Sequence, residues 1–383
     1  MTALRQSADL ALLARERRVP GLAVLLDDDR LAAANGEPTR VERLRYKPGA
    51  GVVAALRTER GERRYLAAYA DPAKAGKDLQ SAVRLGARLA PVEDAPGTVL
   101  GGLEGDRPIA RALVRLRRRL PGIDARAAVL RHNPGRRIVL RLEDGRVLKL
   151  AARGHDRMLV AIIGGDLAAA GVPVVAEEGV ARVAEATLLP WWGRGDLLAR
   201  PEPTAARLAG EAVAALHASS PPAGAILLAE RSLRRDLAGA RDGVAAVLPA
   251  LAADAGEIAD AVLRGVERSA TPPTVSHGDL SPDQVLLGDD GVRLIDLDRV
   301  CLASPAADLG GFRAAAMLEG LEPLADALLA GYAEHRLLPT ERELRLHCAA
   351  SLLGRATEPF RTRRDGWEHT VAENLRLAQA VLP

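Results

Sequence analysis

A chain of 383 residues exceeds the length at which a single hydrophobic core usually stops growing, so two or three compact units are expected. The formal net charge of +3 is small for this length and acids are interspersed with the basic residues, which disfavours a nucleic-acid-binding protein. Two cysteines are too few for a disulfide framework, and charges interrupt every apolar run near the N-terminus, so we expect no membrane span and a location in the reducing cytoplasm.

Residues 44–69 alternate apolar and polar side chains around glycines, which predicts strands joined by tight turns. Their beginning, RYKPGAGVVAALR, is similar to a second stretch that starts at Arg131, RHNPGRRIVLRLEDGRVLKL. Both contain Arg-x-x-Pro-Gly, a β-branched run and a glycine turn before another strand. We interpret them as a degenerate internal repeat in which Tyr65 corresponds to Lys149. Two unrelated hairpins that share turn chemistry are the alternative.

Helical patterns predominate in the later part of the chain. Residues 109–120 have helical apolar spacing with arginines on the opposite face, which is typical of a helix with one solvated face. A further helix is predicted after Lys149, ending near Ala170, and a strand at 183–189. The remaining helices are predicted at 205–218, 233–252, 255–268, 306–319, 323–335, 341–357 and 367–381.

The stretch SHGDLSPDQVLLGDDGVRLIDLDRV, which begins at Ser276, concentrates chemically active residues in a short segment. Asp279 follows His277 by two positions, and Gln284 follows Asp279 by five. The apolar runs on either side of the turn at 288–291 predict a short hairpin. This hairpin would bring Asp296 beside the loop that carries Asp279.

Transfer of a phosphoryl group to an alcohol needs a carboxylate that accepts the hydroxyl proton and oxygen ligands that hold Mg²⁺ on nucleotide phosphates. Asp279 is the candidate base. Asp296 is the candidate principal metal ligand, and the side-chain oxygen of Gln284 is a second one at a position where kinases usually present asparagine. Magnesium accepts carbonyl oxygens, so glutamine is chemically suitable.

This segment resembles the Brenner-type motif of the aminoglycoside phosphotransferase and choline kinase superfamily, which shares the protein-kinase fold. The resemblance rests on His-Gly-Asp-Leu, Gln284, Ile-Asp-Leu-Asp and the later run from Pro305 through Asp308 to Gly310. The glutamine variant is similar to bacterial maltokinases and glucosamine kinases, which also carry an extra N-terminal cap domain.

The resemblance implies an α+β, bilobal protein-kinase-like fold with a β-rich N-lobe, a helical C-lobe and an added α/β cap. We expect the cap at residues 1–100, the N-lobe at 101–190 and the C-lobe at 191–383. It also implies an enzyme that uses ATP and Mg²⁺ to phosphorylate a hydroxyl of a small molecule, a sugar or amino sugar. The alternatives are an aminoglycoside phosphotransferase and a non-catalytic nucleotide-binding pseudokinase.

Three residues of the motif are interpreted as structural support of the site. In the family, His277 mainly packs and hydrogen-bonds to hold the loop. Asp298 either contacts the metal or bonds to the loop backbone. Asp308 lies at the start of a predicted helix, where capping of the free N–H groups explains its presence.

The nucleotide side of the site is predicted around Lys149, which is the only lysine after residue 77 in a chain that otherwise uses arginine. In the kinase fold, a lysine at this place reaches the phosphates. Arg136, in the turn of the preceding hairpin, is a second candidate phosphate contact. Leu189 belongs to the expected hinge that faces adenine. The acid that would hold the lysine is sought on the next helix, where the candidates are Asp156 and Asp166.

The acceptor is expected between the catalytic loop and the C-terminal helices. Arg355 and Glu358, one helical turn apart, are candidate substrate contacts, and a solvated ion pair is the alternative. Several arginines gather in this part of the chain, whereas a polycationic aminoglycoside requires an acidic pocket. This composition favours a sugar or another small alcohol.

Overall fold

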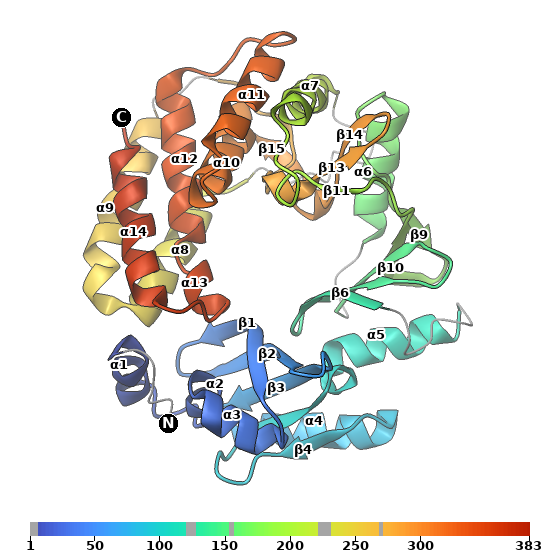
Figure 1. Ribbon diagram of the computed structural model, residues 1–383, viewed down its shortest axis with the longest axis vertical. Coiled ribbons are helices and arrows are strands. Elements are labelled where there is room, and N and C mark those ends of the chain that lie inside the picture. Colours follow the sequence, from blue (N-terminus) through green and yellow to red (C-terminus); the bar gives the residue numbers. More distant parts are fainter. Residues whose placement is uncertain (1–6, 120–127, 153–156, 221–230, 268–270) are drawn as a thin grey trace.

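The computed structural model describes residues 7–119, 128–152, 157–220, 231–267 and 271–383. Figure 1 shows a sheet near the N-terminus in blue, a second sheet in green and a helical part that continues to the C-terminus. This mixture of antiparallel sheets and a helical C-terminal part confirms the expected α+β class. Within the described residues, no helix is both long and apolar enough to cross a membrane.

The first unit is a five-stranded sheet with the order β1-β2-β3-β5-β4 and four helices. Its glycine turns follow the sequence pattern, since Gly49 and Gly61 both adopt positive φ, where a side chain would be strained. Its elements are α1 (Ser7–Arg15), α2 (Gly21–Leu26), α3 (Asp28–Asn35), β1 (Thr39–Lys47), β2 (Gly51–Thr58), β3 (Arg63–Tyr69), α4 (Pro72–Leu85), β4 (Leu89–Pro91) and β5 (Thr98–Gly102).

The second unit is a five-stranded sheet with the order β6-β7-β8-β10-β9. Helix α5 buries its apolar face against this sheet, and none of its four arginines is among its buried residues. The predicted strand at 183–189 is confirmed as β10, and residue 120 of the predicted helix lies outside the described residues. The elements are α5 (Arg107–Arg117), β6 (Ala128–Asn133), β7 (Arg137–Arg141), β8 (Val147–Ala151), α6 (Met158–Ala169), β9 (Glu178–Val180) and β10 (Val183–Leu189).

The two sheets have equivalent strand orders. In each, three strands form a meander, a helix follows, and two further strands complete the sheet, the last of them next to the third strand of the meander. Tyr65 and Lys149 are both the third residue of their meander's third strand. We propose on this basis that the two units are a duplicated element. The predicted boundaries lie within β5 and just after β10, and the division into three domains stays a prediction.

The third part contains most of the helices and three short strand pairs. Strand β13 pairs with both β11 and β14, and β12 pairs with β15. The elements are β11 (Gly195–Asp196), α7 (Pro203–Ala218), α8 (Leu233–Val247), α9 (Ala252–Val266), β12 (Thr274–Ser276), β13 (Val285–Gly288), β14 (Gly291–Leu294), β15 (Cys301–Ala303), α10 (Pro305–Leu318), α11 (Glu322–Ala333), α12 (Glu341–Arg355), α13 (Glu358–Arg361) and α14 (Trp367–Ala380).

Two helix predictions need correction. The helix expected at 233–252 ends at Val247, because Pro249 has no N–H to continue the ladder and disfavours a helical conformation in the residue before it. The short helix α13 was not predicted, since it has only four residues and begins with Glu358-Pro359. It lies against β1 of the first unit, far away in the sequence.

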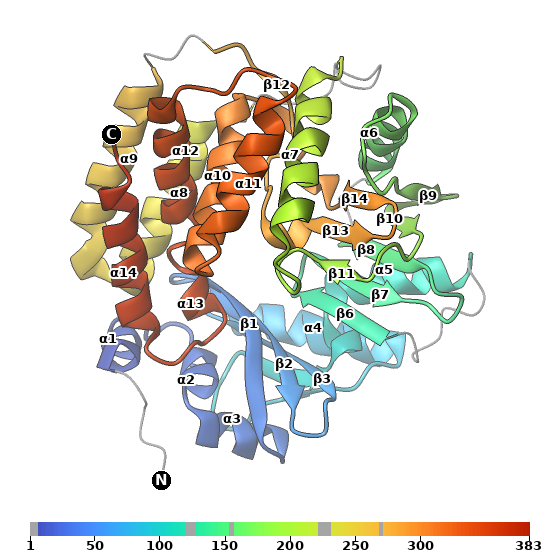
Figure 2. The ribbon, with the colours of Figure 1, turned by 45° about the horizontal axis from the view of Figure 1, so that its top comes forward.

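The first unit packs against the end of the chain, where α1 and α2 lie near α13 and α14 (Figure 2). Asp9, whose side chain is fully buried, accepts two hydrogen bonds from the guanidinium of Arg363 at 2.9 and 2.7 Å. It accepts a third from the indole N–H of Trp367 at 3.2 Å. The Trp367 ring meets Phe360 edge to face, with centroids 4.9 Å apart. This polar contact within an apolar cluster specifies how the two ends of the chain meet.

We predict that Asp9→Ala lowers the free energy of unfolding by about 3–5 kcal/mol, because the substitution leaves the largely buried Arg363 cation without its partner. Asp242→Ala is the control, since the Asp242 side chain is 70% exposed and pairs with another exposed side chain. This change should alter stability by less than about 0.5 kcal/mol. Urea denaturation followed by circular dichroism measures both, and equal midpoints for the two variants would contradict the prediction.

Candidate active site

A buried carboxylate holds the backbone of the loop that carries Asp279. Asp308 accepts hydrogen bonds from the N–H of His277 at 2.6 Å, the N–H of Gly278 at 2.9 Å and the ring Nε2 of His217 at 3.1 Å. Burial raises the pKa of Asp308, but the hydrogen bond and charge of His217 outweigh it and leave the pKa below its usual value. The prediction that Asp308 caps its helix is wrong, because Ser304 is the N-cap of α10.

Two further features fix the path of this loop. Gly278 has a φ of +79°, and a Cβ there would lie 2.1 Å from the Arg299 carbonyl oxygen, so only glycine fits. The ring Nε2 of His277 donates to the carbonyl of Ile295 at 2.7 Å. This bond ties the loop to the segment that leads into Asp296.

Asp279 follows this anchored backbone and faces the cavity with its side chain 47% exposed. The nearest cations are Arg299 and Arg355, each 3.7 Å from one of its carboxylate oxygens. The predicted substrate contact Arg355 therefore lies beside the predicted base. Glu358 does not pair with Arg355. It binds Arg43 of the first unit and Arg361 of its own helix instead.

Asp296 is the residue on which several cations converge. It adopts a left-handed conformation, with a φ of +66°, which is uncommon outside glycine and often found at functional sites. Arg137 makes two parallel hydrogen bonds to its carboxylate at 2.9 Å each, and Lys149 lies at 3.2 Å. Burial raises the pKa of Asp296, but the charges of Lys149 and Arg137 outweigh it and hold the pKa far below its usual value. The carboxylate is thus fully ionised.

The acidic partner of Lys149 is Glu177, at 2.7 Å. The sequence predicted Asp156 or Asp166 in this role. Asp166 is exposed on α6, so the prediction is wrong for this residue, and Asp156 lies outside the described residues. Glu177 follows α6 and immediately precedes β9, so a search restricted to the helix misses it. It also binds Arg157 at 2.5 Å and the hydroxyl of Thr187 at 2.6 Å.

Asp298 binds side chains and not the loop backbone. Its carboxylate contacts Arg137, and Arg157 at 3.0 and 2.9 Å. Because Arg157 also binds Glu177, one continuous network joins both acids of the Ile-Asp-Leu-Asp segment to the second sheet and to the start of α6. The structure assigns Asp298 to this network.

Gln284 lies in the same cavity as Asp279 and Asp296 and is 7% exposed. Its side-chain Nε2 donates to Asp283 at 3.0 Å, and its backbone carbonyl oxygen accepts from the N–H of Ile295 at 3.0 Å. With the amide nitrogen engaged, the side-chain Oε1 is available as a ligand. The set of oxygen donors from Asp296 and Gln284 fits the hard-ligand preference of Mg²⁺.

The turn between β6 and β7 is held by Asp106, at the junction of the two sheets. Its buried carboxylate accepts from the N–H of Gly135 at 2.7 Å and contacts His132 Nε2 at 2.9 Å. The turn places Arg136 on the cavity wall. Leu189, the other predicted nucleotide contact, is 5% exposed and pairs with Val147, and it does not line this cavity.

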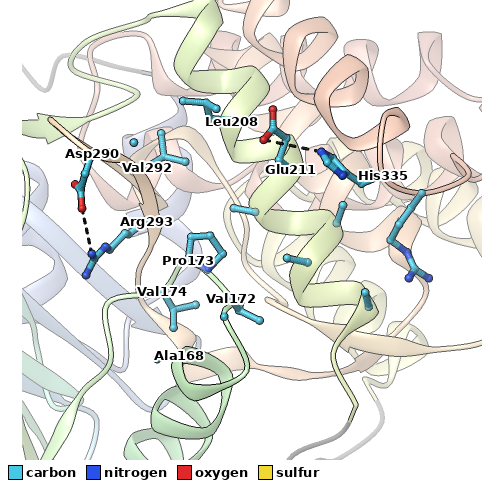
Figure 3. Close-up of a pocket in the computed structure, with 17 residues that line it drawn as sticks. Ala168, Val172, Pro173, Val174, Leu208, Glu211, Asp290, Val292, Arg293 and His335 are labelled. Carbon is cyan, nitrogen blue, oxygen red and sulfur yellow. Dashed lines mark hydrogen bonds and ion pairs between the residues drawn. The ribbon is translucent and has the colours of Figure 1, made fainter.

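The cavity that contains these groups has a volume of about 1080 Å³. A second cavity, of about 760 Å³, lies between α7, the turn before β9 and the β13–β14 hairpin (Figure 3). Its walls are largely apolar around Val172 and Leu208, with the Glu211 and His335 pair at one side. None of the predicted site residues lines it.

The sequence model of the phosphotransferase enzyme family matches residues 116–347, more than half of the chain. The chain belongs to this family. Its fold is similar to that of a choline/ethanolamine kinase family protein from Mesorhizobium loti, with a TM-score of 0.54 at 17% identity over 70% of this chain and 94% of that one.

Two antibiotic kinases have similar folds. Spectinomycin phosphotransferase, solved with ADP and spectinomycin, gives a TM-score of 0.54 at 13% identity over 71% of this chain and 98% of its own. Amicoumacin kinase, solved with AMP-PNP, Ca²⁺ and its antibiotic, gives 0.52 at 12% identity over 71% and 95%. No curated protein sequence matches the chain.

These findings confirm the expected superfamily, the kinase-like fold and the class of enzyme, a small-molecule kinase of the phosphotransferase family. The match begins in α5, so it covers the second unit and much of the helical part but not the first unit. The roles of single residues in the site stay predictions.

We predict that Glu177→Ala lowers the free energy of unfolding by about 3–5 kcal/mol, because it leaves the buried cations Lys149 and Arg157 without one shared partner. Glu178→Ala, at the exposed neighbouring position, is the matched control and should change stability by less than about 0.5 kcal/mol. Thermal melting of the two variants measures the difference, and similar melting temperatures would show that the network adds no stability.

We predict that His347 makes the stability of the protein depend on pH. Burial of this side chain and the nearby charge of Arg231 lower its pKa to about 4. The unfolded chain binds a proton near pH 6.5 and the folded chain does not, so stability should fall by about 3 kcal/mol as the pH drops from about 6.5 to 4. His347→Gln should flatten this slope in urea denaturation.

The control for this prediction is His369→Gln, because the His369 side chain is 82% exposed. That variant should keep the slope of the unsubstituted protein. If His347→Gln shows the same pH slope as His369→Gln, the buried neutral histidine is not the source of the effect.

Proposed function

We propose that this protein transfers the γ-phosphoryl group of ATP to a hydroxyl of a sugar or a similar small polyhydroxyl compound, with Mg²⁺ as cofactor. The observation that carries the proposal is the convergence of Asp279, Gln284, Asp296 and Arg136 on one cavity, with Lys149 bound to Asp296 behind it. The relatives of similar fold that were solved with ADP or AMP-PNP support the choice of nucleotide.

In this proposal Asp279 accepts the proton of the acceptor hydroxyl at a carboxylate oxygen. The hydroxyl oxygen forms a bond to the γ-phosphorus while the bond between that phosphorus and the β–γ bridging oxygen breaks, so ADP leaves. Lys149 stays charged and orients phosphate oxygens. Asp296 and Gln284 would hold the Mg²⁺ ion, which would neutralise phosphate charge.

Asp308 and His277 are positioning residues in this proposal. They fix the backbone from which Asp279 projects, and misplacement of a catalytic group by about 1 Å can cost roughly 100-fold in rate. The arginines that line the cavity near Asp279 disfavour polycationic aminoglycosides and amino sugars as acceptors.

A non-catalytic nucleotide-binding protein is the second candidate. The observation that favours it is the pair between Arg137 and Asp296, in which a guanidinium occupies both oxygens of the predicted metal ligand. Binding of Mg²⁺ and ATP without phosphorylation of any acceptor would support this alternative.

We predict that Asp279→Asn reduces kcat by about 10²–10⁴-fold while binding of Mg²⁺ and ATP is unchanged, because the amide cannot accept the hydroxyl proton. ADP release is measured across sugars, amino sugars and aminoglycosides, and nucleotide binding is measured by calorimetry. Asp289→Asn is the control, since its side chain is 98% exposed on the β13–β14 turn. Unchanged turnover in Asp279→Asn would rule out Asp279 as the base.

A further inference from the structure

The cavity has a basic wall beside the predicted base. Six arginine side chains from four separate segments line it there, and we call them the basic wall: Arg43, Arg45, Arg136, Arg299, Arg355 and Arg361. Two come from β1 of the first unit, one from the β6–β7 turn and three from the helical part. Figure 1 shows β1 close to α13, so the first unit forms part of the site.

The basic wall has too few acids to neutralise it. Arg43 and Arg361 share the single carboxylate of Glu358 at 2.9 and 2.8 Å. Among the acids of the described residues, Arg299 and Arg355 reach only Asp279, each at 3.7 Å.

The two remaining arginines, Arg45 and Arg136, have no acidic partner among the described residues. Six cations therefore face two carboxylates. Like charges held this close repel one another and favour an anion between them.

The same crowding is visible at Arg136. Burial lowers the pKa of its guanidinium, and the charges of Arg45, Arg299, Arg361 and Arg43 lower it further. These four cations all belong to the basic wall. A bound anion would relieve this repulsion at Arg136.

The basic wall is separate from the cations that serve the predicted metal ligands. Lys149, Arg137 and Arg157 bind Asp296, Asp298 and Glu177, so their charges are already matched. The basic wall instead adjoins Asp279 through Arg299 and Arg355. It therefore lies on the side where the acceptor hydroxyl must approach the base.

We propose that the acceptor is an alcohol that already carries an anionic group, a phosphate ester or a carboxylate, and that Arg45 and Arg136 bind this group. Guanidinium groups suit it, because their paired N–H donors match the oxygens of both anions. The first unit contributes Arg45 and so takes part in substrate selection. This inference rests on the proposed kinase function and names its class of acceptor.

The test uses the full chain loaded with Mg²⁺ and AMP-PNP, so that the nucleotide phosphates already occupy their own sites. Isothermal titration calorimetry then measures the binding of inorganic phosphate, malonate and spermidine. The variants are Arg45→Gln, which leaves the predicted nucleotide contact Arg136 in place, and Arg234→Gln as a control, since the Arg234 side chain is 71% exposed and lies outside the cavity.

We expect phosphate or malonate to bind the unsubstituted protein and the Arg234→Gln variant equally. The Arg45→Gln variant should bind the same anion at least about tenfold more weakly, the loss expected when charge-assisted hydrogen bonds are removed. Affinity for AMP-PNP should be the same in all three proteins, because Arg45 is not a predicted nucleotide contact. Tighter binding of phosphate assigns a phosphate ester to the acceptor, and tighter binding of malonate assigns a carboxylate.

Unchanged anion affinity in the Arg45→Gln variant, no anion binding at all, or tighter binding of spermidine than of either anion would overturn the inference. These outcomes leave the proposed kinase function intact when AMP-PNP and Mg²⁺ bind. Failure of AMP-PNP to bind would instead contradict the proposed function. In that case the anion titration of the nucleotide-free chain still decides whether Arg45 and Arg136 form an anion site.

Discussion

Asp296 and its cations connect the parts of the molecule that the proposed chemistry requires. The carboxylate comes from the segment after the β13–β14 hairpin, Lys149 from β8 and Arg137 from the start of β7. The network continues through Arg157 to Glu177, so the second sheet is held against the helical part by ion pairs that are largely withdrawn from water. Removal of one member would leave another charge buried alone, which is far more costly than the loss of an exposed pair.

Asp308 anchors the loop that carries Asp279 and so complements this network. One carboxylate satisfies two consecutive backbone N–H groups and a histidine, so the loop conformation is fixed before any ligand arrives. A rigid loop on one side of the cavity and an ionic network on the other place Asp279 and Asp296 in the same space. Phosphoryl transfer depends on such preorganisation, because positioning and charge stabilisation supply most of the rate enhancement.

The first unit lies beside the cavity and contributes side chains to its wall. It lies outside the region matched by the phosphotransferase family, yet β1 brings Arg43 and Arg45 to the cavity wall and Asp9 anchors the unit to the last helices. An element with the same strand order as the second sheet thus lies across the acceptor side of the site. Differences among the chemistries of this family can arise from such added units while the phosphotransfer loop is retained.

The sequence by itself determined the elements whose cause is local. The spacing from His277 to Asp298 predicted a loop and a hairpin that share one site. A tight turn between two short strands leaves few possible arrangements for residues this close in the sequence. The partner of Lys149 and the surroundings of Glu358 were decided by tertiary structure alone. Glu177 lies 28 positions after Lys149, and Arg43 lies 315 positions before Glu358. A single sequence does not show which charged residues, far apart along the chain, form pairs. That depends on how whole sheets and helices pack against one another.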